Sequence, residues 1–463
     1  MSVIYRKIQQ IIGPLVFLKN EHHAQFGEIV LIRTDDDNIR MGQIVKMSEE
    51  LIVVEVFEDT TGLSTENAEI IFTEDTFKVK ISKDMLGQTF NSLGKPIDIK
   101  TKALLDSDIL SDVQRDINGV PINPFAREYP VDIIQTGISV IDGLFTLIRG
   151  QKLPIFSGQG LTHNKLAAQI ATQAKVLAEE PFVIIFCGIG IIQDEAIYFL
   201  NRFQESGSIQ NIISFINFAD DPIIERLIIP RVALTTAEYF AFEKDMHVLV
   251  ILIDMTNYAE ALRELSSAKE EIPSRKGYPG YIYSDFASIY ERTGKIKGKK
   301  GTITQIPILT MPSDDISHPI SDTTGYITEG QLVLSRSLHK KGIYPPFEVL
   351  ASISRLMKDA IGKDKTREDH ADVSSQLLSA YSNYLEVKDL ISIVGEDGLS
   401  FEQKNFLKFG VDFEQKFLKQ EINENRDFET TLNLAWEVLS NLTIDQLFRV
   451  HSRFLDKYYK IRV

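Results

Sequence analysis

The chain has 463 residues, of which 43% are hydrophobic, so it is long enough to form two or three domains with buried cores. It carries 50 Lys and Arg residues against 65 Asp and Glu residues, a net charge of −15, which argues against nucleic acid as its main partner. Cys187 is the single cysteine, which excludes an internal disulfide and a cysteine-based zinc site. The sequence shows no signal-peptide run, bilayer-spanning segment or lipidation signal, so we expect any attachment to a membrane to run through other subunits.

Residues 1–73 are expected to form a small β-barrel or β-sandwich. Their apolar runs are short and are separated by clusters of Gly, Asp and Asn, which is typical of strands joined by turns. We interpret residues 8–17 as one strand that bends at Gly13 and Pro14. Three more strands are expected at residues 26–32, 42–46 and 51–57.

The middle of the chain has the pattern of an α/β domain. After a stretch rich in turn-forming residues, which reaches about residue 150, apolar runs alternate with helical patterns. The clearest runs, each long enough for a buried strand, lie at residues 182–187, 211–216, 248–253 and 301–309. Strands that alternate with helices predict a mostly parallel sheet covered by those helices.

Beyond residue 366 the sequence predicts helices. The stretch that begins at Thr366 resembles a capped helix start, and Ser400 and Thr443 each begin a capping-box pattern. One helical face is expected to contain Leu432, Trp436 and Leu439.

The stretch of residues 156–165 resembles a phosphate-binding P-loop that has lost its chemical groups. It follows an apolar strand-like segment and opens a helix pattern. The inner face of that helix is expected to contain Leu166, Ile170, Gln173 and Leu177. A P-loop that starts at Gly158 needs a second glycine, then Lys, then Ser or Thr. The chain has His163, Asn164 and Lys165 at these three positions.

Each replacement removes part of the chemistry of nucleotide binding. His163 puts a side chain where the backbone must approach phosphate closely, Asn164 supplies no cation, and Lys165 has no hydroxyl for Mg²⁺. Two interpretations stay open: a helix start without a ligand, or a degenerate nucleotide site. The degenerate site would contain Gly158, Gln159, Gly160, His163, Asn164, Lys165 and Asp254.

Two strand ends bear on that choice. Asp254 follows the run at residues 248–253, where a carboxylate can reach Mg²⁺ through water, although an Asp there is often a turn or helix cap. The run that contains Cys187, which we interpret as a buried apolar residue, ends without an acid that could position water. Asp194 and Glu195 come later, and we interpret them as the start of the next helix.

Arg355 ends a strand of small residues that follows the bend at Pro345 and Pro346. Its planar, permanently charged fork is suited to phosphate oxygens. Composition alone favours a surface salt bridge for it.

Together these motifs resemble the non-catalytic B subunits, or beta chains, of V-type and archaeal-type rotary ATPases. The resemblance covers essentially the full length and implies three domains: a β-barrel (residues 1–73), a RecA-like α/β domain (74–365) and a helical bundle (366–463). The residues that carry it are 157–167, 237–239, 246–264, 277–281, 305–312 and 324–331.

The resemblance implies that three such chains alternate with three catalytic A subunits around a central rotor, with peripheral stalk subunits outside. The assembly would couple ATP synthesis or hydrolysis to proton or sodium transport from the cytoplasmic face of a membrane. Mg²⁺ with ATP or ADP would be held mainly by the A subunit at the A–B interface. Whether this chain binds a nucleotide at its own site stays open.

The resemblance also assigns site residues. Arg355 matches an arginine that completes the neighbouring A subunit's catalytic site, and Ser352 lies on the same strand. Tyr326 and Glu329 match an interface loop of the family. Where the A subunit has Gly-Glu-Arg, this chain has Gly190, Ile191 and Ile192. Its other departures from the family pattern are Phe347, Glu348 and Lys165.

Three alternatives remain. An autonomous ATPase of the same fold is opposed by Asn164 and Ile191. A hexameric RNA translocase is opposed by the net charge of −15. A purely structural scaffold predicts that Arg355→Ala leaves turnover of the complex unchanged.

Overall fold

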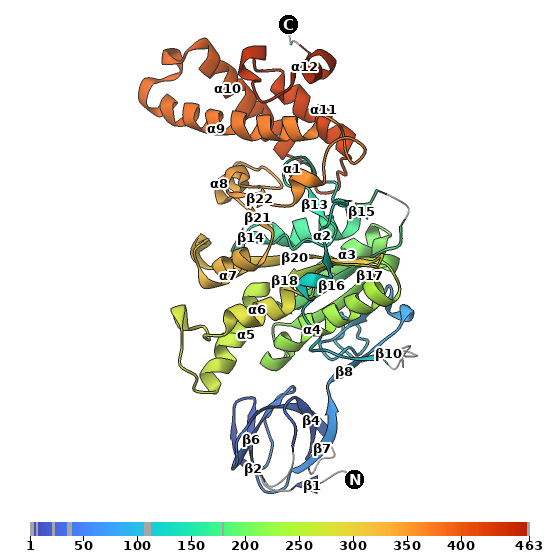
Figure 1. Ribbon diagram of the computed structural model, residues 1–463. Coiled ribbons are helices and arrows are strands. Elements are labelled where there is room, and N and C mark those ends of the chain that lie inside the picture. Colours follow the sequence, from blue (N-terminus) through green and yellow to red (C-terminus); the bar gives the residue numbers. More distant parts are fainter. Residues whose placement is uncertain are drawn as a thin grey trace. The chain divides into compact units, whose positions relative to one another are not determined.

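A computed structural model of the chain describes residues 4–5, 8–20, 24–34, 39–105, 113–177 and 180–460 (Figure 1). Residues 1–3 and 6–7 of the predicted first domain lie outside this description. The chain divides into two compact units. The first contains Met1–Ile122, Val183–Lys244 and Val250–Arg292, and the second contains Asn123–Phe182, Asp245–Leu249 and Thr293–Val463.

In the first unit, an antiparallel seven-stranded sheet curls on itself (blue ribbon in Figure 1). Its buried side chains form one hydrophobic core. Its strands follow the order β1-β7-β4-β5-β6-β3-β2. They are β1 (Ile4–Tyr5), β2 (Ile8–Ile12), β3 (Leu15–Lys19), β4 (Glu28–Arg33), β5 (Ile39–Met47), β6 (Leu51–Val56) and β7 (Glu69–Thr76). The prediction of one bent strand over residues 8–17 is wrong. Gly13 adopts a left-handed φ of +52°, so the chain reverses and β2 pairs antiparallel with β3.

The α/β part of the first unit is built on parallel pairs. β17 (Ile212–Phe218) pairs in parallel with β9 (Thr89–Phe90) and with β16 (Phe182–Ile191). Phe186 of β16 packs on Phe199 with ring centroids 4.4 Å apart, which holds the following helix on the sheet. The remaining elements are β8 (Lys78–Ile81), β10 (Val113–Asp116), α3 (Gln193–Glu205), α4 (Ile223–Glu238), α5 (Met255–Ala268) and α6 (Ile282–Tyr290). The fully buried β18 (His247–Ile253) begins in residues of the second unit and ends in residues of the first.

The second unit has its own parallel pairs. β14 (Ile155–Gly158) pairs in parallel with β20 (Thr302–Met311) and with β21 (Gly330–Val333), and β22 (Ile353–Ser354) runs antiparallel to β21. Parallel pairing in both units confirms the predicted α/β class with a mostly parallel sheet. The remaining elements before residue 366 are β11 (Arg127–Glu128), β12 (Ile133–Gln135), β13 (Leu147–Ile148), β15 (Lys175–Val176), β19 (Gly294–Ile296), α1 (Ser139–Leu144), α2 (His163–Gln173), α7 (Pro319–Ile327) and α8 (Arg336–Lys340).

The end of the second unit is helical, as predicted. It consists of α9 (His370–Val394), α10 (Phe401–Asp412), α11 (Phe428–Leu439) and α12 (Ser452–Tyr458). Ser400 and Gln403 form the predicted capping box at the start of α10, whereas the box at Thr443 begins only a short 3-10 turn. The stretch from Thr366 makes no side-chain cap, and α9 begins after it, at His370. Three side chains of α11 are buried as expected: Leu432, Trp436 and Leu439.

Among the helices in the described residues, none combines the length and the apolar character that crossing a bilayer requires.

Candidate functional site

The P-loop-like stretch has the predicted order of strand, turn and helix. β14 ends at Gly158, the turn follows, and α2 begins at His163. Gly160 holds the turn in a left-handed conformation, with φ of +77°, which a residue with a side chain rarely adopts. The helix is shorter than predicted. It ends at Gln173, so the predicted inner-face residue Leu177 lies beyond it with 48% of its surface exposed.

The side chain at the missing glycine position folds back onto the strand. The Nδ1 atom of His163 lies 2.9 Å from the hydroxyl oxygen of Ser157, which is fully buried. Asn164 follows, half-buried, and Lys165 is exposed. The first turn of α2 therefore contains one cation, displaced by one residue from the P-loop position.

An ion pair that the sequence motifs did not reveal lies on this turn. The Arg336 guanidinium donates two hydrogen bonds to the Asp314 carboxylate, at 2.5 and 2.8 Å, and one to the backbone oxygen of Gln159 at 2.9 Å. A Cβ atom on Gly158 would lie only 2.1 Å from Asp314 Oδ1, which explains the glycine. Hydrogen bonding to Arg336 lowers the pKa of Asp314, so the carboxylate is ionised beside the turn and opposes a second anion there.

A cavity of about 310 Å³ lies beside the start of α2. Its walls come from Thr162 and Lys165, from His339 and residues 342–344, and from residues 419–422. The Thr162 hydroxyl oxygen is buried and has no hydrogen-bond partner within the described part of the chain. The hydroxyl of Tyr344 donates to Gln169 Oε1 at 2.8 Å, which fixes the aromatic ring. The cavity thus combines two lysines, Lys165 and Lys419, with an aromatic ring and a hydroxyl that has no partner among the described residues.

Asp254 caps a helix. It directly follows β18, and its Oδ1 atom accepts a hydrogen bond from the backbone N–H of Thr256 at 2.8 Å, the geometry of a cap on α5. It belongs to the first unit, whereas the P-loop-like turn belongs to the second. A role as a Mg²⁺ ligand stays a prediction.

The end of β16 provides no carboxylate. Ile191 is buried, Ile192 is exposed, and Asn257 closes the strand by donating to the oxygens of Ile189 and Gly190 at 2.9 and 3.0 Å. Glu195 accepts from the N–H of Ile192 at 3.3 Å. This contact confirms that the acids after β16 start α3.

Arg355 follows β22 and is exposed. Its backbone N–H donates to the oxygen of Glu329 at 2.9 Å, and its Nη1 donates to the oxygen of Thr328 at 3.1 Å. No carboxylate pairs with it within residues 4–460 as far as these are described. The described residues therefore show no surface salt bridge of the kind that composition favoured, and most of the guanidinium makes no contact with them.

The other predicted interface residues differ in exposure. Tyr326 exposes 79% of its surface. Ser352 is buried, and its hydroxyl accepts from the N–H of Val333 at 2.9 Å and donates to the oxygen of Glu348 at 2.8 Å. Glu329 forms an ion pair with Lys152 at 2.8 Å.

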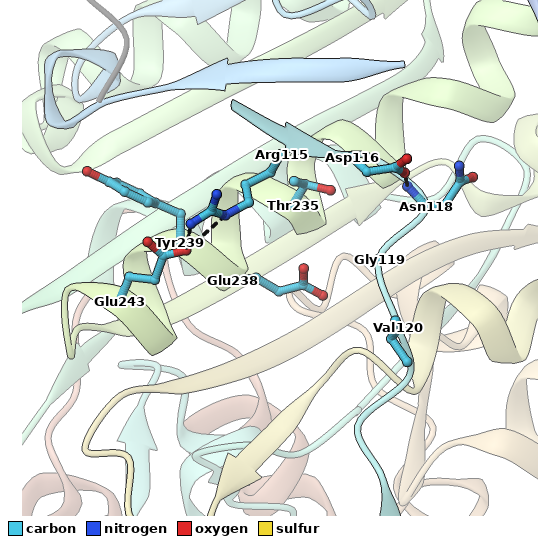
Figure 2. A pocket seen from close by; sticks show the side chains of 9 residues that line it. All are labelled: Arg115, Asp116, Asn118, Gly119, Val120, Thr235, Glu238, Tyr239 and Glu243. Carbon is cyan, nitrogen blue, oxygen red and sulfur yellow. Dashed lines mark hydrogen bonds and ion pairs between the residues drawn. The ribbon is translucent and has the colours of Figure 1, made fainter. Parts of the chain in front are cut away.

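A second cavity, of about 470 Å³, lies in the first unit (Figure 2). Arg115 reaches across it to Glu243, 3.0 Å away. The carboxylate of Glu238 on the same wall binds the fully buried Arg292. Its arginine and both glutamates are paired among the described residues, and Asp116 Oδ1 accepts from the N–H of Asn118 at 2.7 Å, so the lining offers no unpaired cation to an anionic ligand.

Comparisons with known proteins agree with this architecture. Three family models match: the beta-barrel domain of the ATP synthase alpha/beta family at residues 8–74, the nucleotide-binding domain of that family at 137–354, and the C-terminal domain of V and A type ATP synthase at 359–459. A solved structure described as a unique ATP synthase subunit NeqB from Nanoarcheaum equitans superimposes with a TM-score of 0.73 at 41% identity, covering 92% of this chain and 98% of that one. The V-type ATP synthase beta chain of Halothermothrix orenii is 54% identical over 457 residues, which are 98% of this chain and 97% of that protein. The chain belongs to the V-type ATP synthase beta chain family.

Proposed function

We propose that this chain is a non-catalytic, regulatory B subunit that alternates with catalytic A subunits in a ring and supplies Arg355 to their ATP sites. One contrast supports the proposal. The chain's own turn at Gly158 lacks the glycine, lysine and hydroxyl of a P-loop, whereas Arg355 is exposed and has no carboxylate partner among the described residues. Such a chain is equipped to assist phosphoryl transfer in a neighbour's site rather than to perform it in its own.

The residues of this chain do not fit Mg²⁺ at its own turn. Lys165 stands where a P-loop has the hydroxyl ligand, and one oxygen of Asp254 is already engaged with a backbone N–H. Mg²⁺ with ATP or ADP is therefore assigned to the A–B interface, held mainly by the A subunit. Bound there, the metal would neutralise charge on the phosphates.

Arg355 would stabilise the negative charge that develops on the transferred phosphoryl group. Among the described residues its side chain contacts a neutral backbone oxygen, that of Thr328, and no described carboxylate cancels its charge. An arginine supplied across an interface is worth roughly 10³–10⁵ in rate in related nucleotide hydrolases. Tyr326 is proposed to contact the A subunit through its exposed ring, and Ser352 to support the strand that leads to Arg355.

A nucleotide at the chain's own site is a second candidate function, favoured by the cavity beside α2. Lys165 and Lys419 offer cations for phosphate, and the ring of Tyr344 offers a surface for a base. The degenerate turn, Gly158 to Gly160, would contribute backbone only. Titration of the purified chain with ADP, followed by calorimetry, tests this, with Lys165→Ala expected to weaken binding at least threefold.

Because the chain belongs to the V-type ATP synthase beta chain family, we propose that the assembled complex couples ATP synthesis or hydrolysis to proton or sodium transport. The partners would be the A subunit, central rotor subunits and peripheral stalk subunits. The chain would sit in the head of the complex at the cytoplasmic face of a membrane, which it reaches only through those subunits.

The test of the main proposal is Arg355→Ala in the assembled complex. ATP turnover is expected to fall on the order of 10³-fold, while ring assembly and nucleotide binding by the A subunit are kept. Arg202→Ala, which removes an arginine paired with Glu205 at 3.4 Å on α3, is the matched control and should leave turnover unchanged. Wild-type rates for Arg355→Ala would remove the arginine from the mechanism, and hydrolysis by the purified chain alone would overturn the non-catalytic role.

A further inference from the structure

We propose that Lys152 and Glu329 form a positioning pair that sets the direction of the Arg355 side chain. This inference rests on the proposed function, because it matters for turnover only if Arg355 acts on a neighbour's ATP. It also gives a role to Glu329, which the sequence singled out without assigning it any chemistry.

Three contacts join the two residues. The Nζ atom of Lys152 lies 2.8 Å from Glu329 Oε1, and the backbone N–H of Lys152 donates to Oε2 at 2.8 Å. In return, the backbone N–H of Glu329 donates to the oxygen of Lys152 at 3.1 Å. The Lys152 side chain is only 3% exposed, and the Glu329 carboxylate supplies a compensating negative charge for its ammonium. The pair therefore fixes both the backbone and the side chain of Glu329.

The segment fixed in this way is the one that holds Arg355. The oxygen of Glu329 accepts the backbone N–H of Arg355, and the preceding oxygen, of Thr328, accepts from its guanidinium. Gln151, next to Lys152, donates to the same Glu329 oxygen at 3.2 Å and to the hydroxyl of Ser354 at 2.9 Å. Residues 151–152 thus contact both Glu329, which precedes β21, and Ser354, which precedes Arg355.

The backbone around Glu329 is closely packed. A Cβ atom on Gly330 would lie 2.3 Å from the backbone oxygen of Ile353, so β21 and β22 approach each other closely at this point. The side chain of Thr328 is buried and donates to the oxygens of Thr324 and Gly330, at 2.8 and 3.1 Å. A shift of Glu329 would therefore carry the Thr328 oxygen, and with it the guanidinium, away from its position.

The test uses assembled complexes and separates kcat from KM. Glu329→Gln is expected to lower kcat on the order of 10²-fold, because displacement by about 1 Å costs that much, with KM for ATP within about twofold. Lys152→Met should have the same effect, and Lys152→Arg should keep most of the turnover. Glu414→Gln is the matched control. It breaks a Lys–Glu pair in the same unit, with Lys341 at 2.6 Å, that does not touch residues 328–330, and should leave kcat unchanged.

A double-mutant cycle distinguishes positioning from general loosening. In an Arg355→Lys background, Glu329→Gln should lower kcat by less than a further threefold, because the guanidinium that the pair positions has already been replaced. Equal losses in both backgrounds would overturn the proposal. If Glu329→Gln prevents folding, Lys152→Met with Glu329→Leu replaces the pair by apolar side chains. A folded double variant with wild-type kcat would also overturn it.

The two proposals fail in different ways. Wild-type turnover by Arg355→Ala complexes would refute the proposed function and remove the basis for this inference. Loss of turnover by Arg355→Ala together with wild-type turnover by Glu329→Gln would refute the positioning pair alone.

Discussion

The imidazole of His163 lies 2.9 Å from the hydroxyl of Ser157, across the start of the turn where a P-loop would fold around a phosphate. The same hydroxyl also reaches the oxygen of Gly158, at 3.2 Å. The residue that replaces the second glycine therefore ties the helix start to the strand. We therefore expect this turn to bind phosphate more weakly than an intact P-loop, because of this contact as well as the missing charge.

Restoring the motif should restore binding without restoring hydrolysis. The triple variant His163→Gly, Asn164→Lys, Lys165→Thr should bind Mg²⁺-ADP at least tenfold more tightly than the native chain, measured by calorimetry on the purified protein. No turnover is expected, because Ile191 and Ile192 provide no carboxylate to position water.

Asp314 offers a further check on this prediction. Its carboxylate lies against Gly158 and opposes phosphate, so adding Asp314→Asn to the triple variant should increase the affinity again. Lys165→Thr alone is the control and should not raise affinity. Unchanged binding by the triple variant would mean that the turn is not a degenerate nucleotide site.

His370 is expected to make the chain sensitive to acid. Its Nε2 donates to the oxygen of Gly143 and its Nδ1 accepts from the hydroxyl of Thr366, both at 3.0 Å, so the ring is held neutral. Burial lowers the pKa of His370 to about 4. The unfolded chain takes up this proton near pH 6.5, whereas the folded chain does not. The free energy of unfolding therefore keeps its full value above pH 6.5 and falls by about 3 kcal/mol as the pH drops towards 4.

The measurement is the unfolding temperature of the wild type and of His370→Gln between pH 7 and 4.5. The variant cannot gain the charge, so its unfolding temperature should fall less over this range. His339→Gln, at a half-buried site with no ion pair among the described residues, is the control and should behave like the wild type. Parallel curves for the wild type and His370→Gln would contradict the assignment.

The sequence predicted the elements whose signals are local. Continuous apolar runs identified β16 and β18 as buried strands, and the capping box at Ser400 marked the start of α10 because both partners lie within one turn. Periodicity could not tell where α2 stops, so Leu177 was placed on a helix that had already ended. The hairpin at Gly13 was missed because apolar residues continue on both sides of the turn.

Only those site residues that belong to a sequence motif could be predicted. The replaced positions His163, Asn164 and Lys165 are visible in sequence, whereas the Asp314–Arg336 pair joins residues with no motif spacing and meets the turn only through the fold. The salt bridge expected for Arg355 came from composition, which carries no information about which carboxylates lie nearby.

Glu225 should give the chain a pH response of the opposite sign. Burial in α4, reinforced by the neighbouring carboxylate of Asp221, raises the pKa of Glu225 to about 7. The folded state holds this proton while the unfolded chain releases it near pH 4.5, so stability is lost as pH rises from about 4.5 to 7, by about 3 kcal/mol. The unfolding temperature of Glu225→Gln should therefore exceed that of the wild type by more at pH 8 than at pH 5. Glu205→Gln, at an exposed site on α3, should not, and a shift of equal size there would contradict the prediction.

Arg292 and Glu238 should contribute strongly to stability. The Arg292 guanidinium is fully buried and donates to both oxygens of Glu238, at 2.6 and 2.8 Å, to the hydroxyl of Thr235 and to the backbone oxygen of Ile117. Glu238→Gln leaves this charge uncompensated, which costs about 3–5 kcal/mol in buried pairs. At about 2–4 °C for each kcal/mol, the unfolding temperature should fall by roughly 6–20 °C.

The cavity of Figure 2 supplies the control, because Glu243 lies on the same wall five residues further along the chain. Its partner Arg115 is about half exposed, at 48%, so Glu243→Gln should cost under about 1 kcal/mol. Replacing both buried residues, by Glu238→Leu with Arg292→Met, should recover much of the loss, since the cost comes from the unpaired charge and not from the absence of the pair. Equal losses for Glu238→Gln and Glu243→Gln would show that burial of the Arg292 guanidinium does not determine the stability of this unit.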